Sequence, residues 1–425
     1  MAVRLGILIL AVLLPAQSEL PKDVIQLSQL KREVGKAVAT LDNYTCMETI
    51  DRQERKNSRQ RFQHLDTLNV EVAVVKDREL YSWPGAREFE DQDVAEMVGA
   101  GLMSTGGFRS AIKSVFIDNV STIKWHGEEE ILGRRALRWD YVIPYNLSGW
   151  EVQAEGRSGR VSESGSFWAD AETLELLSIE TVAGDIPTDL HLATIKQTVD
   201  YSPMHVRGRD LLLPQSVEMY VTKLNGAESL NRIEFSHCHE FSGAAELSFN
   251  KPTPVESPAS AVTELQIPAG LEVSVRMAQT IDSKTAAVGD SIRATIDAPV
   301  RSRGAELIPK GALLLGRIRR LERQSEPHPY YLVGLEFTDI EFTGHHARFT
   351  GQMVGTVPIP GLALGVSTYS MNRNTAGVAG HLITTHSETE VPFKVPGVSV
   401  FFMEGSDFRI PEGMHMSWLT TKLGK

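Results

Sequence analysis

The spacing of apolar positions predicts one helix at the start of the chain, followed by a strand. Within residues 19–42 apolar side chains recur with the period of a helix, and Asn43 follows as its end. The next stretch, "YTCMETIDRQER", alternates between apolar and polar positions, as a strand does. This alternation places one set of side chains on a single face of the strand: Tyr44, Cys46, Glu48 and Ile50.

Most of the chain up to Phe241 also alternates with the period of a strand. "LNVEVAVVKDRELYSW" predicts two strands around a turn near Lys76-Asp77, and residues 121–241 predict strand after strand. Turn signals divide the second region into hairpins, at Gly133-Arg134, Glu172-Thr173 and Asn225-Gly226. Between the two regions, "DQDVAEMVGAGLMSTGGFRSAIKSVF" predicts two helices. We therefore expect a large antiparallel sheet with a few helices that cover one of its faces.

A proline-rich stretch divides the chain into two parts. "FNKPTPVESPASAVTE" places three prolines among Ser, Ala and Thr, a composition that favours an extended linker. A chain of 425 residues also exceeds the usual size of a single core. We predict a mainly β protein with two domains, residues 19–242 and 265–425, joined by a linker at residues 243–264.

The second half predicts an all-β, barrel-like domain of short strands between Gly and Pro turns. The pattern I-P-x-G recurs there, at residues 267–270, 308–311 and 410–413. Proline at the second position and glycine at the fourth match a type I turn that leads into a strand. Since the third residue varies, we interpret the repeat as turn chemistry and not as a binding motif. We interpret the Gly-rich residues 355–380 as an excursion from the barrel, with an apolar contact segment as the alternative.

The first residues have the features of an export signal. A positive Arg4, a short apolar run at residues 5–14 and small residues before Glu19 predict cleavage after Ser18. The run is too short to span a bilayer, and no later stretch predicts a membrane-spanning helix. We expect an exported protein, periplasmic or extracellular.

Composition and the two cysteines indicate which class of partner is disfavoured and predict a covalent cross-link. Lys+Arg 43 against Asp+Glu 54 gives a net charge of −11, which opposes binding to nucleic acid. Cys46 and Cys238 stand near the start and the end of the first predicted domain. An even pair of cysteines in an exported protein predicts a disulfide, with two unrelated buried thiols as the alternative.

The order of elements in the first half resembles that of a known family. A leading helix, a meandering antiparallel sheet and inserted helices resemble the LolA/LolB-type half-barrel, which RseB-like periplasmic sensors also use. "GSFWADAETLELLSIE" is similar to a hairpin of those proteins, in which an aromatic-Asp strand turns into an apolar one. The resemblance covers roughly residues 20–242 and concerns topology, so no binding residues follow from it. It implies an apolar cavity, between sheet and helices, that holds acyl chains or lipoproteins.

A second resemblance covers residues 265–342. "IPAGLEVSVRMAQTIDSK", "VGDSIRATIDAPV" and "IPKGALLLGRI" are similar to the β-barrel domain of the outer subunit of conjugation and type IV secretion channels. The rest of the chain lacks that subunit's transmembrane helix and proline-rich stalk, so the resemblance implies a shared barrel module and not secretion activity.

Catalytic motifs are missing from the sequence, and one stretch qualifies as a metal candidate. There is no G-x-S-x-G, H-E-x-x-H or Walker motif, and no G-x-G-x-x-G after a strand. In "HCHEF", His237 and His239 would share one face of a strand, but no third ligand stands out. We expect both histidines to face solvent while Cys238 faces inward, and therefore no metal and no cofactor. We interpret Glu128-Glu129-Glu130 as a solvated turn.

Aromatic residues suggest a different function. Several fall in the predicted sheet or its inserted helices: Trp125, Trp139, Trp150, Trp168, Phe108 and Phe116. Most belong to the core, and if the half-barrel is correct, at most two or three of them line an apolar pocket. Our hypothesis is a non-enzymatic, exported envelope protein that binds an apolar ligand or lipoprotein in its first domain and an envelope protein through its second. The alternative is a structural component of an envelope complex without a small ligand, and an enzyme ranks third.

Overall fold

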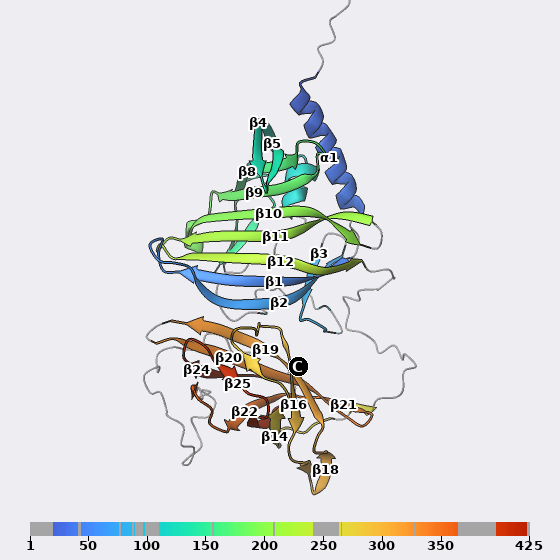
Figure 1. The fold of residues 1–425 in the computed structure, drawn as a ribbon, viewed down its shortest axis with the longest axis vertical. Helices are drawn as coiled ribbons and strands as arrows, with labels where there is room; N and C mark the ends of the chain where they lie inside the picture. Colours follow the sequence, from blue (N-terminus) through green and yellow to red (C-terminus); the bar gives the residue numbers. More distant parts are fainter. Residues whose placement is uncertain are drawn as a thin grey trace, which may run out of the picture.

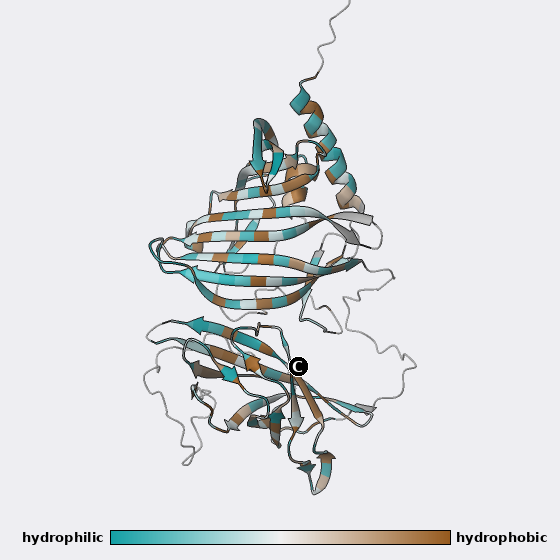
Figure 2. Cartoon of the chain, viewed as in Figure 1, coloured by the Kyte–Doolittle hydropathy of each residue, from teal (hydrophilic) through white to brown (hydrophobic). Residues whose placement is uncertain are grey.

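The computed structural model describes residues 20–40, 44–75, 78–86, 89, 97, 110–154, 157–206, 209–240, 263–264, 266–325, 328–363 and 397–422. Two large sheets dominate it, one from each half of the chain (Figure 1). Apolar and polar residues alternate along the strands of both sheets (Figure 2). The predicted mainly β architecture in two parts is confirmed. The predicted export signal, most of the linker and most of the Gly-rich excursion lie outside the described residues.

The first sheet has ten strands in the order β3-β2-β1-β12-β11-β10-β9-β8-β5-β4, and all neighbours run antiparallel. The strands are β1 (Tyr44–Arg55), β2 (Gln63–Val75), β3 (Arg78–Ser82), β4 (Thr122–Ile131), β5 (Arg134–Ile143), β8 (Ser162–Asp170), β9 (Leu176–Gly184), β10 (Leu192–Val206), β11 (Arg209–Lys223) and β12 (Glu228–Glu240). A separate hairpin joins β6 (Glu151–Ala154) to β7 (Arg157–Arg160). The predicted strands and the turns at Gly133-Arg134, Glu172-Thr173 and Asn225-Gly226 are therefore confirmed, and the predicted turn near Lys76-Asp77 lies outside the described residues.

Helices accompany this sheet in the described part of the chain. They are α1 (Lys22–Thr40), α3 (Ser110–Ile112), the π-helix η1 (Lys113–Ile117) and the 3-10 helix η2 (Thr188–Leu190). The apolar stripe of α1 buries Leu30 and Val34 in the core, whereas Val24 and Ile25 near its start remain exposed. The predicted first helix is thus confirmed over Lys22–Thr40. Within the described part of the chain, no helix is both long and apolar enough to cross a membrane.

The second sheet curls into a nearly closed barrel. Its strands are β13 (Thr263–Glu264), β14 (Glu272–Met277), β16 (Ser291–Ile296), β19 (Leu313–Gln324), β20 (Tyr330–Phe342), β21 (His345–Arg348), β22 (Gly351–Thr356), β23 (Leu362–Ala363), β24 (Val398–Glu404) and β26 (His415–Thr420). Two small sheets join β15 (Ile281–Asp282) to β25 (Arg409–Ile410) and β17 (Val300–Ser302) to β18 (Ala305–Ile308). A strand path runs β24-β20-β19-β16-β14-β26-β22, and the Met353 N–H then donates to Ser399 Oγ at 2.7 Å. This bond links β22 to β24, the first and last strands of the path, and so nearly closes the barrel.

The I-P-x-G repeats lie at strand entries, but their turn type differs from the prediction. Ala312 N–H donates to the Pro309 carbonyl at 3.3 Å, so proline is the first residue of the turn and Gly311 the third. Gly311 has φ of 87°, the left-handed value that type II turns require at that position. The turn at Pro411 closes in the same way onto Met414, and Gly413 has φ of 83°. The predicted type I turn is therefore wrong, and the glycine is needed for its backbone conformation.

A loop of the barrel binds directly to the first sheet. Asn69 N–H donates to the Val288 carbonyl and Val288 N–H to the Thr67 carbonyl, both at 2.8 Å. Asn69 Nδ2 also donates to Asp290 Oδ1 at 3.0 Å. Gly289 permits this approach, because a Cβ there would lie 2.2 Å from the Asn69 carbonyl oxygen.

An aromatic contact strengthens the same junction. The guanidinium groups of Arg317 and Arg319, on β19, lie 5.6 and 4.8 Å from the ring centre of Trp83, which follows β3. Cation–π contacts that are shielded from water contribute more than exposed ones. Backbone bonds, an amide–carboxylate bond and a ring contact therefore hold the two halves together.

We predict that Gly289→Ala weakens the junction while both sheets still fold. Its φ of 97° and the short approach to Asn69 make any side chain unfavourable at this position. Differential scanning calorimetry should show one cooperative transition for the wild type and two separate transitions for the variant. Gly344→Ala is the control, since Gly344 also has a positive φ of 75° but nothing within 4 Å of its Cβ position. Equal scans for the two variants would contradict the proposed coupling.

Candidate ligand-binding interior of the first sheet

The concave face of the first sheet is lined mainly by apolar side chains. On β1 every second residue from Tyr44 to Arg52 is buried, which confirms the predicted face. The cross-strand register places the matching buried residues of neighbouring strands on the same side: Val70, Val72, Val74, Ile179, Val199, Val217, Ile233, Phe167 and Phe235. Leu30 and Val34 of α1 pack into the same core, together with Phe116 of η1.

The curl of the sheet brings distant strands to a common interior. β3 and β10 are separated by four other strands in the sheet order. Burial is the main cause that raises the pKa of Tyr201 on β10, and Tyr141, Asp200 and Glu79 on β3 raise it further. Charges are screened less in a protein interior than in water, so Glu79 acts on Tyr201 although the two belong to strands that are not neighbours in the sheet.

One buried ion pair lies on this face, and its two charged groups bond to each other. Arg52 Nε donates to Asp66 Oδ1 at 2.7 Å, and Arg52 Nη2 donates to Asp66 Oδ2 at 2.5 Å. Both side chains are only 2% exposed. A bidentate pair of this kind satisfies both charges without a ligand.

Glu48 is the exception among the buried charges. It is 0% exposed, and neither carboxylate oxygen has a hydrogen-bond partner. Burial first, and the charge of Glu79 second, raise the pKa of Glu48 well above its usual value. The hydroxyl of Tyr201 and the indole N–H of Trp139 are also buried without a hydrogen-bond partner. Buried polar groups are nearly always satisfied, so such groups on one concave face mark a candidate site.

The aromatic residues that were candidates for lining a pocket lie partly in the interior of the sheet and partly elsewhere in the first half of the chain. Trp139 is 1% exposed and stacks on Phe167 at 5.5 Å, while Phe116 meets Phe167 edge-on at 4.8 Å. Trp125 contacts Trp139 but is 39% exposed, which places it at the rim. Trp150 packs in a separate cluster, and Trp168 faces the convex side. Phe108 lies outside the described residues.

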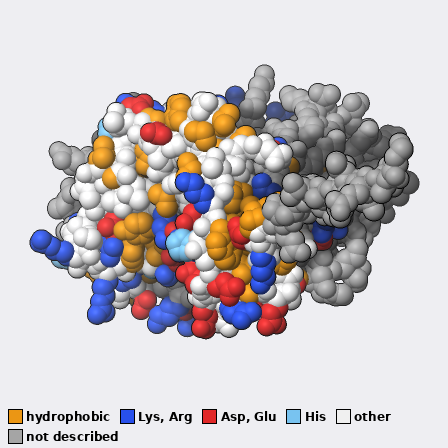
Figure 3. All heavy atoms as spheres, turned by 90° about the horizontal axis from the view of Figure 1, so that it is seen from above, with side chains coloured by type: hydrophobic (Ala, Val, Ile, Leu, Met, Phe, Trp, Pro, Cys, Tyr) orange, Lys and Arg blue, Asp and Glu red, His pale blue; other side chains and the backbone are white. Residues whose placement is uncertain are grey.

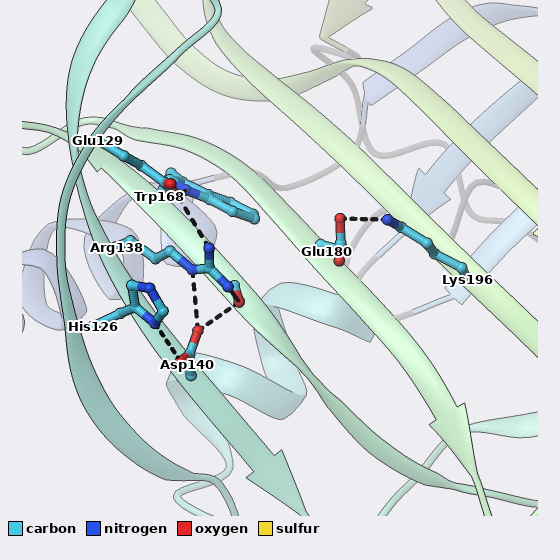
Figure 4. Close-up of polar contacts among 8 residues, drawn as sticks. His126, Glu129, Arg138, Asp140, Trp168, Glu180 and Lys196 are labelled. Carbon is cyan, nitrogen blue, oxygen red and sulfur yellow. Dashed lines mark hydrogen bonds and ion pairs between the residues drawn. The ribbon is translucent and has the colours of Figure 1, made fainter.

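The convex face carries a polar network (Figure 4). Asp140 accepts hydrogen bonds from Ser166 Oγ at 2.7 Å and Arg138 Nε at 3.1 Å, and it contacts His126 Nδ1 at 2.7 Å. Partial burial opposes ionisation of Asp140, but these partners together lower its pKa. Glu128, Glu129 and Glu130 are exposed, as predicted, but they lie in strand β4 and not in a turn. Glu129 accepts a hydrogen bond from Trp168. We interpret the network as part of the solvated outer surface of the sheet.

The end of the molecule near α1 and β4 shows no single type of side chain. In the view of Figure 3, apolar side chains are interspersed with acidic and basic ones. Exposed apolar residues of β4, β5 and the turn between them include Trp125, Leu132 and Val142.

A β-bulge explains the geometry of the "HCHEF" stretch. Thr45 pairs with His239 and Met47 with Ser236, so Cys46 faces two residues, His237 and Cys238. His237 takes a left-handed φ of 51°, and Cys238 is joined to Cys46 by a disulfide. Both histidines are exposed, and His239 Nε2 contacts Thr45 Oγ1 at 2.9 Å. Among the residues that the structure describes, no group of three His, Cys, Asp or Glu side chains gathers for a metal.

Comparison with known proteins yields distant similarities of fold. No family model matches the chain, and no curated protein of similar sequence matches it. A DUF1329 family protein from Desulfovibrio piger aligns at 11% identity and a TM-score of 0.30, over 53% of this chain and 97% of its own. A putative outer membrane lipoprotein-sorting protein domain from Vibrio parahaemolyticus aligns at 10% identity and a TM-score of 0.29, over 52% and 95%. A LolA superfamily protein from Nitrosomonas europaea aligns at 7% identity and a TM-score of 0.27, over 53% and 97%.

The LolA-type resemblance noted in the sequence thus has counterparts among solved structures. Overlaps with TM-scores this low carry no argument about a shared ligand. None of these neighbours is a secretion-channel subunit, so the resemblance of residues 265–342 to such a barrel stays a prediction.

We predict that Glu48→Gln stabilises the protein increasingly as pH rises. Because the buried acid keeps its proton to a higher pH than the unfolded chain does, the folded state binds more protons above about pH 4.3. Wild-type stability therefore falls as pH rises through that region, and removing the charge should restore about 1–3 kcal/mol near pH 8. Chemical denaturation from pH 4 to pH 8 measures the difference. Glu234→Gln, on the exposed side of β12, is the control and should follow the wild type.

We also predict that the disulfide stabilises the fold. Its cysteines are 192 residues apart, so the bond restricts a long loop of the unfolded chain. Loss of the bond in Cys46→Ala/Cys238→Ala should lower the free energy of unfolding by up to about 5 kcal/mol. The measurement is urea denaturation with and without reductant. Reductant should destabilise the wild type and leave the variant unchanged, and a wild type that ignores reductant would contradict the prediction.

Proposed function

We propose that the protein is a non-enzymatic, exported envelope protein whose first sheet holds an apolar ligand or the acyl part of a lipoprotein. The observation that supports this most is the concave apolar face with the unmatched Glu48, Tyr201 and Trp139. A face built only for packing would have satisfied or replaced these groups. The disulfide between Cys46 and Cys238 supports an oxidising, exported location.

The second domain is proposed to contact an envelope protein. Support comes from apolar side chains that the barrel leaves exposed on and beside its neighbouring strands β22 and β26: Val354, Val357 and Leu419. The domain limits of 19–242 and 265–425 belong to the same proposal. The short strand β13 lies within the predicted linker, so part of that linker pairs with the barrel at β21.

Native mass spectrometry tests ligand binding. The protein purified from cells should carry lipid-like mass that is released by organic solvent. Val199→Trp adds a large ring between Ile179 and Val217 in the concave face, and should lower the bound fraction about tenfold or more. Val354→Trp, on the exposed part of the barrel, is the control.

The outcomes separate the candidate functions. Equal lipid content in both variants, with unfolding curves that show each is folded, would contradict binding in the interior. Stable association with a partner and no bound lipid in the wild type would favour an assembly component instead. Turnover in a hydrolase screen that one point substitution abolishes would overturn the non-enzymatic assignment.

A further inference from the structure

The two end strands of the first sheet differ in their exposure. β3 is one of them, and its residues Leu80, Tyr81 and Ser82 are at most 5% exposed. β4 is the other, and none of its ten residues is buried. Among the described residues β5 is the only strand that pairs with β4, so one edge of β4 has main-chain N–H and C=O groups without a partner. This edge lies at the end of the sheet away from the barrel (Figure 1).

A β-bulge determines which side chains of β4 share the concave side of the sheet. On β5 the alternating residues with this orientation are Arg135, Leu137, Trp139 and Tyr141, and the last three are buried in the core. Their partners on β4 are, in the same order, Glu130, Glu128, Trp125 and Ile123. His126 is the extra residue of the bulge, and it keeps these four side chains on one side. Beside its free edge, β4 thus presents two apolar residues followed by two acids.

Trp125 is the larger of the two apolar residues. Its ring meets that of Trp139 edge-on, with the ring centres 5.1 Å apart, and 39% of the residue remains exposed. Aromatic and β-branched side chains that face each other across neighbouring strands stabilise a sheet. The exposed part of Trp125 can therefore pack against an apolar side chain of an added strand.

The two acids on this side are only weakly compensated within the chain. Arg135 Nε lies 3.9 Å from Glu128 Oε2, and the two side chains are 69% and 49% exposed. An ion pair so exposed contributes little. Glu130 has no ion pair within the described part of the chain. Both carboxylates are thus available to cations of a partner.

The same acids oppose pairing with a second copy of this strand. Antiparallel pairing of two copies about Glu129 would place Glu128 of one opposite Glu130 of the other. Like charges directly opposite each other destabilise a strand pair, whereas opposite charges stabilise it. The edge is therefore complementary to a basic strand and repels a copy of itself.

We propose that β4 binds an extended segment of a partner protein, which adds an antiparallel strand to the first sheet. All neighbours in this sheet are antiparallel, so the segment has, from its N-terminus, two alternate basic residues opposite Glu130 and Glu128 and then two alternate apolar residues opposite Trp125 and Ile123. Main-chain hydrogen bonds supply affinity, and the alternate side chains supply specificity. This surface is separate from the interior and from the barrel strands of the proposed function.

Two peptides test the added strand against the full-length protein. Both are capped at their ends and carry a fluorophore: T-K-T-K-T-V-T-V-T, and the same peptide with both lysines replaced by glutamate. Fluorescence polarisation at low salt should show binding of the lysine peptide at least about tenfold more tightly, because its charges are opposite to those of the edge. Hydrogen exchange should show that the main-chain amides of β4 gain protection in the complex and those of β3 do not.

Variants locate the contact. Trp125→Ala should weaken binding of the lysine peptide about fivefold or more, and Glu130→Lys should weaken it about tenfold and strengthen binding of the glutamate peptide. Glu306→Lys, an equal charge change at an exposed position of β18, is the control and should bind both peptides as the wild type does. Unfolding curves show that each variant is folded.

Three results would overturn the proposal. They are no binding of the lysine peptide at millimolar concentration, equal binding of the two peptides with no effect of Glu130→Lys, and protection of amides elsewhere than in β4. A lysine peptide with methylated main-chain nitrogens provides a further test, since it cannot pair with the edge and should not bind. Binding of that peptide as tight as that of the parent would also contradict an added strand.

Discussion

A ten-stranded antiparallel sheet with one apolar face must hide that face from water, and the whole first half of the protein follows from this requirement. The sheet curls, so that strands far apart in its order meet across a common interior. Helix α1 and the π-helix η1 pack buried side chains against this face. Buried side chains from α1, η1 and strands on both flanks consequently form one continuous core.

Because this face is buried, an ionised Glu48 lowers the stability of the folded protein. An ionised carboxylate without a partner in a protein interior loses its hydration and gains nothing in return. Replacing it with an apolar residue would fit the surrounding valines better. The charges of Arg52 and Asp66 in the same face, by contrast, are neutralised by two hydrogen bonds within the chain.

The sequence predicted the elements well because alternation and turn chemistry are local properties. The face of β1 that carries Tyr44, Cys46, Glu48 and Ile50 could be derived from period alone, and Asn225-Gly226 indicated the hairpin between β11 and β12. Features that depend on how distant strands pair could not be predicted from the sequence. The bulge at His237 is a property of register between β1 and β12, which are far apart in sequence. The missing partner of Glu48 likewise requires knowledge of every strand around it.

The junction at Val288 also has a consequence for solubility. β3 pairs with residues 71–75 of β2, and the only pairing on that side of the earlier part of β2 among the described residues is a bridge between Leu68 and Val288. An uncovered strand edge is a template for pairing with strands of other molecules. The Val288 loop of the barrel therefore covers this edge of the first sheet. A chain that ended at the linker would present that edge to other copies of itself, so the second half protects the first from self-association.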